Sequence, residues 1–213
     1  MKKILFNDRY GLTHKVLIGC KTQTRRVIPD IEIDWVRRGK VHLPVGGYEN
    51  GVLFMDVRSI LHDVGISDYA APAKYQPKYE KGEWIAVAQT YKELIGQGYL
   101  CRESDGWVSE EYVTSPGYSN KMFVRSDLMP HRIRITNICV ERLQDITEED
   151  CLKEGLVEGK QEQKLYGFRL PKGTILSFMT PRAAFAALID RISGRGTWNR
   201  NPWVFVYEFE LIK

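Results

Sequence analysis

The sequence has few cysteines and histidines, and their positions argue against several kinds of site. Its 213 residues include four cysteines, without a Cys-x-x-Cys pair, and four histidines that lie far apart. A structural zinc site needs closely spaced Cys or His ligands, so we expect no metal and no other cofactor. A chain of this length buries a core without disulfides, so we expect free thiols in a reducing cytoplasm.

Long hydrophobic runs are also absent. No apolar segment approaches the roughly 20 residues that span a bilayer, and Met1–Phe6 lacks the apolar core of a signal peptide. The sequence contains no phosphate-binding glycine loop, no Ser-His-Asp arrangement and no dinucleotide fingerprint. The formal charge of +4 is mild, so it permits a nucleic-acid partner without requiring one. We therefore expect a cytoplasmic globular protein with no membrane partner.

Strand and helix patterns along the chain predict an α+β fold. The strands are expected at 4–6, 52–60, 84–91, 131–143 and 203–212, and the helices at 13–18, 147–155 and 180–194. Weaker strand signals at 98–102 and 107–113 suggest an inserted hairpin, 121–125 is expected to be another short strand, and a second hairpin is expected around Pro171–Gly173. In 131–143 the apolar residues stand at odd positions (Ile133, Ile135) and then at even positions (Ile138, Val140), so the face they occupy changes near Thr136. This change predicts a β-bulge, and a bulged strand favours a closed or half-closed barrel.

The stretch Gly19–Arg26 carries most of the polar chemistry near the N-terminus. As a strand it would place Lys21, Gln23 and Arg25 on one face and Thr22, Thr24 and Arg26 on the other. Two hydroxyls and a guanidinium in a row suit an anionic or hydrogen-bonding ligand. The alternative is a solvated basic edge strand without a ligand.

Glu154 is an unusual residue at the end of the helix predicted after Thr147. Thr147 is a good N-cap and Gly155 a good stop, so Glu154 falls in the last turn. A carboxylate there opposes the helix dipole, at a cost of a few tenths to about 1 kcal/mol. Either it is solvated beside Lys153, or a cation elsewhere in the fold binds it.

Five blocks of sequence together resemble the ASCH domain, a branch of the PUA-like superfamily, and most of all its long bacteriophage and bacterial versions. The first block, Gly19–Arg26, is similar to the family pattern Gly-x-Lys-Thr-x-Thr-x-Arg. The others are Gly82-Glu83-Trp84-Ile85-Ala86-Val87, Met129-Pro130, the run 141–150 with Glu154-Gly155, and Asn201-Pro202-Trp203-Val204. The resemblance implies one domain over 1–213, a small β-barrel with helices packed across its openings, and insertions near 30–80, 92–125 and 156–180.

The resemblance also implies a function that involves RNA or modified nucleobases. A set of short ASCH enzymes is similar to amidohydrolases that act on N4-acetylcytidine, with a Lys, a Thr and a Glu as working residues. Those positions fall on Lys21, Thr24 and Glu154 here. Thr24 would be the nucleophile, Lys21 its base, and Glu154 would orient Lys21 or hold the substrate. Long members carry Val-Arg-Glu-Thr-Trp where this chain has Val-Ala-Gln89-Thr-Tyr91, and Gln89 cannot pair a charge.

Three functions therefore stay open. The first is recognition of RNA or a modified nucleoside by the polar cleft, with Lys21 and Thr24 among its contacts and Tyr91 stacking on the base. Its other expected contacts are Thr22, Arg25, Arg26 and Gln89. The second is amide hydrolysis in the same cleft. The third is an accessory protein that makes only protein contacts. The sequence does not indicate an oligomeric state.

Overall fold

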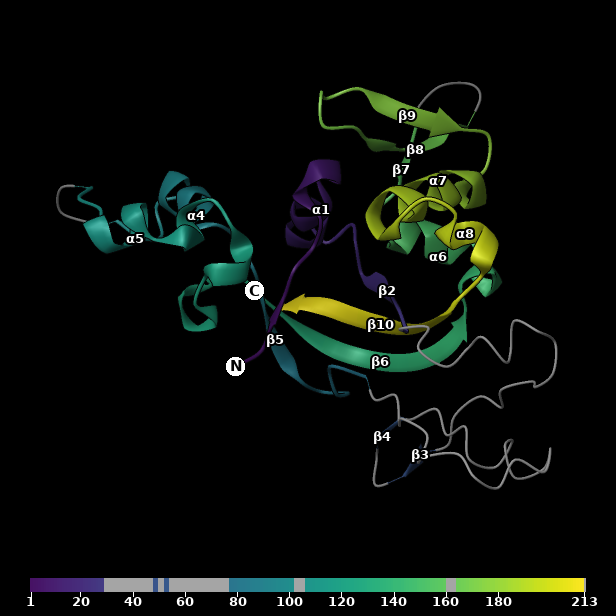
Figure 1. Ribbon diagram of the computed structural model, residues 1–213, viewed down its shortest axis with the longest axis horizontal. Helices are drawn as coiled ribbons and strands as arrows, with labels where there is room; N and C mark the ends of the chain where they lie inside the picture. The colour runs from purple at the N-terminus through teal and green to yellow at the C-terminus, as the bar shows by residue number, and fades with distance from the viewer. Residues whose placement is uncertain (29–47, 50–51, 54–76, 102–105, 160–163, 213) are drawn as a thin grey trace.

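Two long strands in the second half of the chain form the centre of the main sheet. They are β6 (Arg132–Arg142) and β10 (Trp203–Ile212), which pair antiparallel along their whole length. The computed structural model describes residues 1–28, 48–49, 52–53, 77–101, 106–159 and 164–212 (Figure 1). β5 (Trp84–Val87) and β1 (Lys3–Ile4) extend the sheet beyond β6, and β2 (Gln23–Val27) extends it beyond β10. The fold is α+β, as predicted.

The bulge predicted in the longest strand is present. Glu208 of β10 lies opposite Asn137, and Phe209 lies opposite Ile135, so Thr136 is the extra residue of β6. Ile135 and Ile138 are both buried. The bulge explains how residues of opposite sequence parity reach one core, because a one-residue slip reverses the direction of every later side chain.

The expected closed barrel is not detected among the described strands. β1 and β2 are the two edges of the five-stranded sheet and do not pair with each other. Across the gap between them, Nη2 of Arg26 donates a hydrogen bond to the carbonyl oxygen of Leu5, the residue after β1, 2.7 Å away. A cavity lies between β2 and the segment Leu5–Asn7, so side chains, and not a backbone ladder, bridge this gap.

Three helices lie on one side of the curved β6–β10 pair (Figure 1). They are α6 (Glu148–Lys153), α7 (Pro181–Ser193) and α8 (Thr197–Arg200). Thr147 caps α6 by accepting from the Asp150 amide, and Thr180 caps α7 by accepting from the Ala183 amide, so both predicted starts are confirmed. α8 is a single short turn of helix between α7 and β10.

A second, three-stranded sheet packs against α7. Its strands are β7 (Val157–Glu158), β8 (Tyr166–Arg169) and β9 (Ile175–Phe178), paired antiparallel in that order. The hairpin predicted around Pro171–Gly173 joins β8 to β9 and is confirmed. The short strands β3 (Tyr48–Glu49) and β4 (Val52–Leu53) pair with each other, and most of the strand expected at 52–60 lies outside the described residues.

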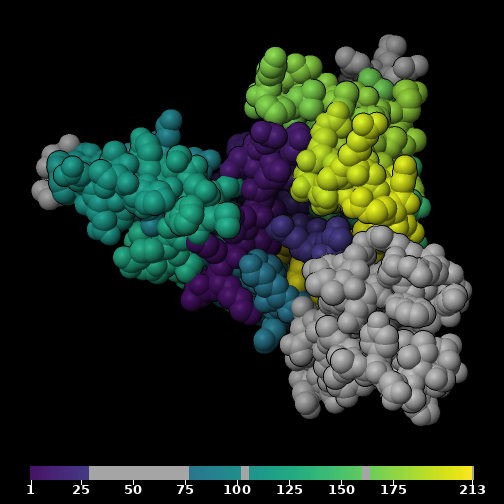
Figure 2. Space-filling model, viewed as in Figure 1, coloured from purple at the N-terminus to yellow at the C-terminus, as the bar shows by residue number. Residues whose placement is uncertain are grey.

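The region 92–125, where an inserted hairpin and a further short strand were expected, is mainly helical in its described residues. It contains α4 (Tyr91–Gly96), α5 (Glu110–Thr114) and a 3-10 turn at Lys121–Phe123, where a strand was expected. Of the expected hairpin, the described residues show one antiparallel bridge, Cys101–Val108. A capping box between Thr90 and Glu93 starts α4 directly after β5, which ends the strand earlier than its apolar pattern suggested. This region forms a lobe that projects from the rest of the molecule (Figure 2).

The N-terminal segment runs between the lobe and the helices around α7 (Figure 1). After β1 it forms the 3-10 turn η1 (Asp8–Tyr10) and the helix α1 (Leu12–Leu17), which leads into β2. The helix predicted before the basic stretch is thus confirmed. Within the described ranges, no helix has both the length and the apolarity needed to cross a bilayer.

Candidate functional site

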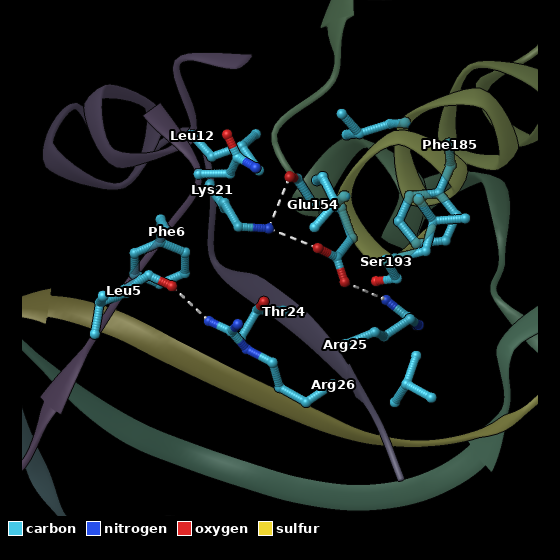
Figure 3. Close-up of a pocket in the computed structure, with 15 residues that line it drawn as sticks. Leu5, Phe6, Leu12, Lys21, Thr24, Arg25, Arg26, Glu154, Phe185 and Ser193 are labelled. Atoms are coloured by element: carbon cyan, nitrogen blue, oxygen red, sulfur yellow. Dashed lines mark hydrogen bonds and ion pairs between the residues drawn. The ribbon is translucent and has the colours of Figure 1, made fainter. Parts of the chain in front are cut away.

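A cavity of about 280 Å³ opens between β2, the segment after β1 and the end of α7 (Figure 3). Its walls divide by chemistry. The polar residues that line it are Lys21, Thr24, Arg25, Arg26, Glu154, Asn7 and Ser193, and the apolar residues are Leu5, Phe6, Leu12, Val27, Phe185, Leu188, Ile189 and Ile192. A largely apolar cavity with a few converging polar groups is the usual form of a small-molecule site.

A buried ion pair lies at the inner end of this cavity. Nζ of Lys21 donates to Oε2 of Glu154 at 2.5 Å and to the backbone oxygen of Glu154 at 2.8 Å. The two side chains are 1% and 6% exposed. Glu154 is the C-cap of α6, and Gly155 follows with a φ of +97°, a backbone conformation that favours glycine. A cation does bind Glu154, so the second of the two alternatives for this residue is the one found.

Arg25 is a second buried cation that contacts the same carboxylate. Its Nη1 donates to Oε1 of Glu154 at 3.2 Å and to Oε1 of Gln23 at 3.1 Å, and its Nε donates to Oε1 of Glu141 at 2.8 Å. Oδ2 of Asp150 lies 3.5 Å from Nη2. With its guanidinium held by these partners, Arg25 is placed to orient Glu154 and has few donors left for a ligand.

The electrostatic surroundings favour the neutral form of Lys21 relative to a lysine in water. Burial is the main cause and lowers the pKa of Lys21 from its ordinary value. Glu154 opposes this change because it stabilises the ammonium, whereas the positive charges of Arg26 and Arg25 add to it. A lysine with a lowered pKa in a cavity is a candidate general base.

Thr24 lies on β2 in the opening between Lys21, Glu154 and Arg26 (Figure 3). It is 5% exposed and pairs with Tyr207 in the β2–β10 ladder, which fixes its backbone. In the described part of the chain, its hydroxyl has no hydrogen-bond partner. The hydroxyl is therefore available to a ligand, but it is not hydrogen-bonded to Lys21 in this structure.

Arg26 forms the outer rim of the cavity. It is exposed, and its guanidinium lies 6.0 Å from the centre of the Phe6 ring. The Lys21 ammonium lies 5.8 Å from the same ring. Phe6 thus contacts two of the site cations. The sequence analysis did not select Phe6, because an aromatic residue after a short apolar strand is ordinary core.

The apolar face of α7 is the other part of the site that the sequence analysis missed. Phe185, Leu188 and Ile189 are buried and belong to the hydrophobic core. They also form a wall of the cavity, which Ile192 and Ser193 continue at the helix end. Ile192 is 36% exposed. Exposure is visible only in the structure, so no signal in the sequence distinguishes this wall from ordinary core.

Three of the expected ligand contacts lie outside this cavity. Gln89 is buried beside the lobe, where its Nε2 donates to Gln97 at 3.2 Å. The Tyr91 hydroxyl accepts from the Arg125 amide at 3.0 Å, and its ring packs on Tyr112. Thr22 is used through its backbone, whose N–H bonds to the Lys153 oxygen at 2.9 Å. The structure does not bring these three side chains to the cavity, whereas Lys21, Thr24, Arg25, Arg26 and Glu154 meet there.

The described residues contain no group of three or more His, Cys, Asp or Glu side chains that could hold a metal ion. Burial raises the pKa of Cys151, a buried cysteine of α6, to about 12, which keeps that thiol protonated. No protein-family model, curated protein or solved structure matches this chain. The resemblance to the ASCH domain therefore rests on the sequence motifs alone.

Proposed function

We propose that this cavity hydrolyses the amide bond of an N4-acylated cytidine or a closely similar nucleobase. One observation carries the proposal: a buried lysine held by a carboxylate shares a small cavity with a threonine hydroxyl that has no partner among the described residues. The three residues are Lys21, Glu154 and Thr24. A nucleophile, a base and a group that orients the base are the parts that acyl transfer needs.

The proposed reaction has two steps. The Thr24 oxygen attacks the acyl carbonyl carbon while the Lys21 amine takes the hydroxyl proton. The C–N bond then breaks, and the Lys21 ammonium returns that proton to the leaving amine of the base. Water hydrolyses the threonine ester to a carboxylic acid and free Thr24. Glu154 holds the Lys21 ammonium between these proton transfers, at the 2.5 Å distance seen in the structure.

The shape and the walls of the cavity support a nucleobase as the substrate. A volume of about 280 Å³ is at the small end of the range for ligand sites, and the apolar walls suit a flat ring. The motif resemblance points to the same substrate class. The sheet, bridged at its open edge by Arg26 and Leu5, supports the half-closed form of the PUA-like barrel that we propose with it.

The direct test is to incubate the protein with N4-acetylcytidine and to measure cytidine and acetate by chromatography. We expect the two products in equal amounts. N4-acetylcytidine that binds, as measured by calorimetry, but stays intact would contradict hydrolysis.

The rate should depend on pH through Lys21. The base acts in its neutral form, so turnover should rise with pH as Lys21 loses its proton and then level off. Because burial lowers the pKa of Lys21, the midpoint of this rise should lie clearly below the ordinary lysine value of 10.5. A kcat profile between neutral and strongly basic pH measures the midpoint. A midpoint at or above 10.5 would contradict the role of Lys21 as the base.

A second candidate function is recognition without chemistry. One observation favours it: the Lys21 ammonium donates to two oxygens of Glu154, and none of its hydrogen bonds in this structure reaches Thr24. In that case Thr24 and Arg26 would hydrogen-bond a modified base, and the acetate assay would give no product.

A further inference from the structure

A second hollow lies on the other side of Arg26 from the Lys21 cavity. Its volume is about 290 Å³, and it shares Leu5, Arg26 and Val27 with that cavity. The remaining residues that line it are Ile28, Lys78, Tyr79, Phe205 and Tyr207. The strand that carries Arg26 reaches the surface next to the N-terminal segment (Figure 2). Arg26 thus stands between two adjoining hollows.

The floor of the second hollow is aromatic and held in place by hydrogen bonds. The rings of Tyr79 and Tyr207 pack edge to face, with centres 5.3 Å apart. The Tyr207 hydroxyl accepts from the Lys78 amide at 2.8 Å, and the Tyr79 hydroxyl donates to the Lys3 oxygen at 3.1 Å. Such a preformed apolar floor suits a flat ring that packs against it.

Arg26 and Lys78, which border this hollow, and Lys3, which lies beyond Lys78, have no carboxylate partner among the described residues. Arg26 donates to the Leu5 backbone oxygen, and Lys3 donates to the backbone oxygens of Met122 and Val124 at 2.8 and 2.6 Å. The Lys78 ammonium lies 5.5 Å from the centre of the Tyr79 ring. By contrast, Lys21, Arg25, Lys121, Arg125 and Arg134 all pair with acids.

These unpaired cations lie along a continuous path. Arg26 borders both hollows, and Lys78 borders the second hollow and a third depression that also includes Lys3. The other charged residues of that depression are Lys2, which pairs with Glu83, and the ion pair of Arg125 with Asp127. Burial and the charge of Lys78 both lower the pKa of Lys3 from its ordinary value. A row of cations without acidic partners produces a positive potential that a polyanion would neutralise.

We propose that Arg26, Lys78 and Lys3 bind successive phosphates of a single-stranded nucleic acid, whose modified base enters the Lys21 cavity. The base next to it packs on the floor formed by Tyr79 and Tyr207. This inference rests on the proposed function, and it deepens that function by making the substrate a polynucleotide and not a free nucleoside. A neutral nucleoside carries no phosphate that three cations could bind, whereas single-stranded nucleic acids bind along basic grooves with aromatic platforms.

The test is the salt dependence of binding to a labelled single-stranded RNA hexamer of unmodified sequence, measured by fluorescence anisotropy over a range of NaCl concentrations. Three phosphate contacts predict a slope of log K against log salt of about −2, since each contact to a single strand contributes about −0.7. Lys78→Gln should reduce the slope to about −1.4. Lys3→Gln should do the same, which guards against an effect specific to one variant.

The matched control is Lys172→Gln, an equal loss of charge at an exposed residue in the β8–β9 turn. It should leave the slope unchanged. A wild-type slope near zero would overturn the proposal, as would equal slopes for Lys78→Gln and the wild type, or equal reductions in Lys78→Gln and Lys172→Gln.

The hexamer carries no acyl group, so its binding does not depend on hydrolysis. A slope near −2 without acetate release from N4-acetylcytidine would remove the proposed function and keep the phosphate path. Acetate release with a slope near zero would support the proposed function and overturn the phosphate path.

Discussion

Replacing Thr24 with valine should lower the rate of acetate release from N4-acetylcytidine by at least about 10³-fold, because removal of a nucleophile eliminates the covalent step. Valine has the shape of threonine and is equally suited to a strand. Thr24 is 5% exposed and its hydroxyl has no partner in the described chain, so the fold should tolerate the change. Nucleoside affinity, measured by calorimetry, should stay within about tenfold, the cost of one lost hydrogen bond.

Thr174→Val is the control for this experiment. Thr174 is an exposed threonine in the turn between β8 and β9, away from the Lys21 cavity, and its replacement should leave turnover as it is. If Thr24→Val keeps the wild-type rate, Thr24 is not the nucleophile. If the wild type itself releases no acetate but binds the nucleoside, recognition without chemistry is the better account.

Replacing Glu154 with glutamine should lower the free energy of unfolding by about 3–5 kcal/mol. The change removes the negative charge that pairs with two buried cations, Lys21 and Arg25, whose side chains are each 1% exposed. A buried charge without its partner is costly, because the protein interior does not solvate it as water does. Urea denaturation followed by circular dichroism measures the loss, as a lower midpoint at an unchanged m-value.

Two further variants separate this electrostatic cause from a general sensitivity to mutation. Glu158→Gln removes a carboxylate from an ion pair with Lys164, whose side chains are 40% and 74% exposed, and should cost less than about 1 kcal/mol. Adding Lys21→Met to Glu154→Gln removes the cation that has lost its carboxylate partner and should recover part of the stability, whereas Arg25 keeps Glu141 and Asp150. If Glu154→Gln costs no more than Glu158→Gln, the buried pair does not hold α6 against β2.

Local signals in the sequence predicted the parts of the fold that depend on neighbouring residues. Thr147 and Thr180 start their helices as expected, because a cap satisfies amide groups only three residues away. The bulge at Thr136 followed from the parity of buried residues along one strand. The failure at α4 has a local cause as well: the apolar run through Tyr91 read as one strand, although the Thr90–Glu93 capping box was present in the same residues.

The sequence by itself determined the caps, the bulge and the α+β class. It also determined that a carboxylate stands at the end of α6, where it opposes the helix dipole. Only the tertiary structure decided which cation binds that acid. Lys21 and Glu154 are 133 residues apart in the chain and meet because α6 packs beside the start of β2. The structure also placed Gln89 and Tyr91 away from the cavity and brought Phe6 and α7 to it. Contacts over such separations depend on strand register and helix packing, which no local pattern encodes.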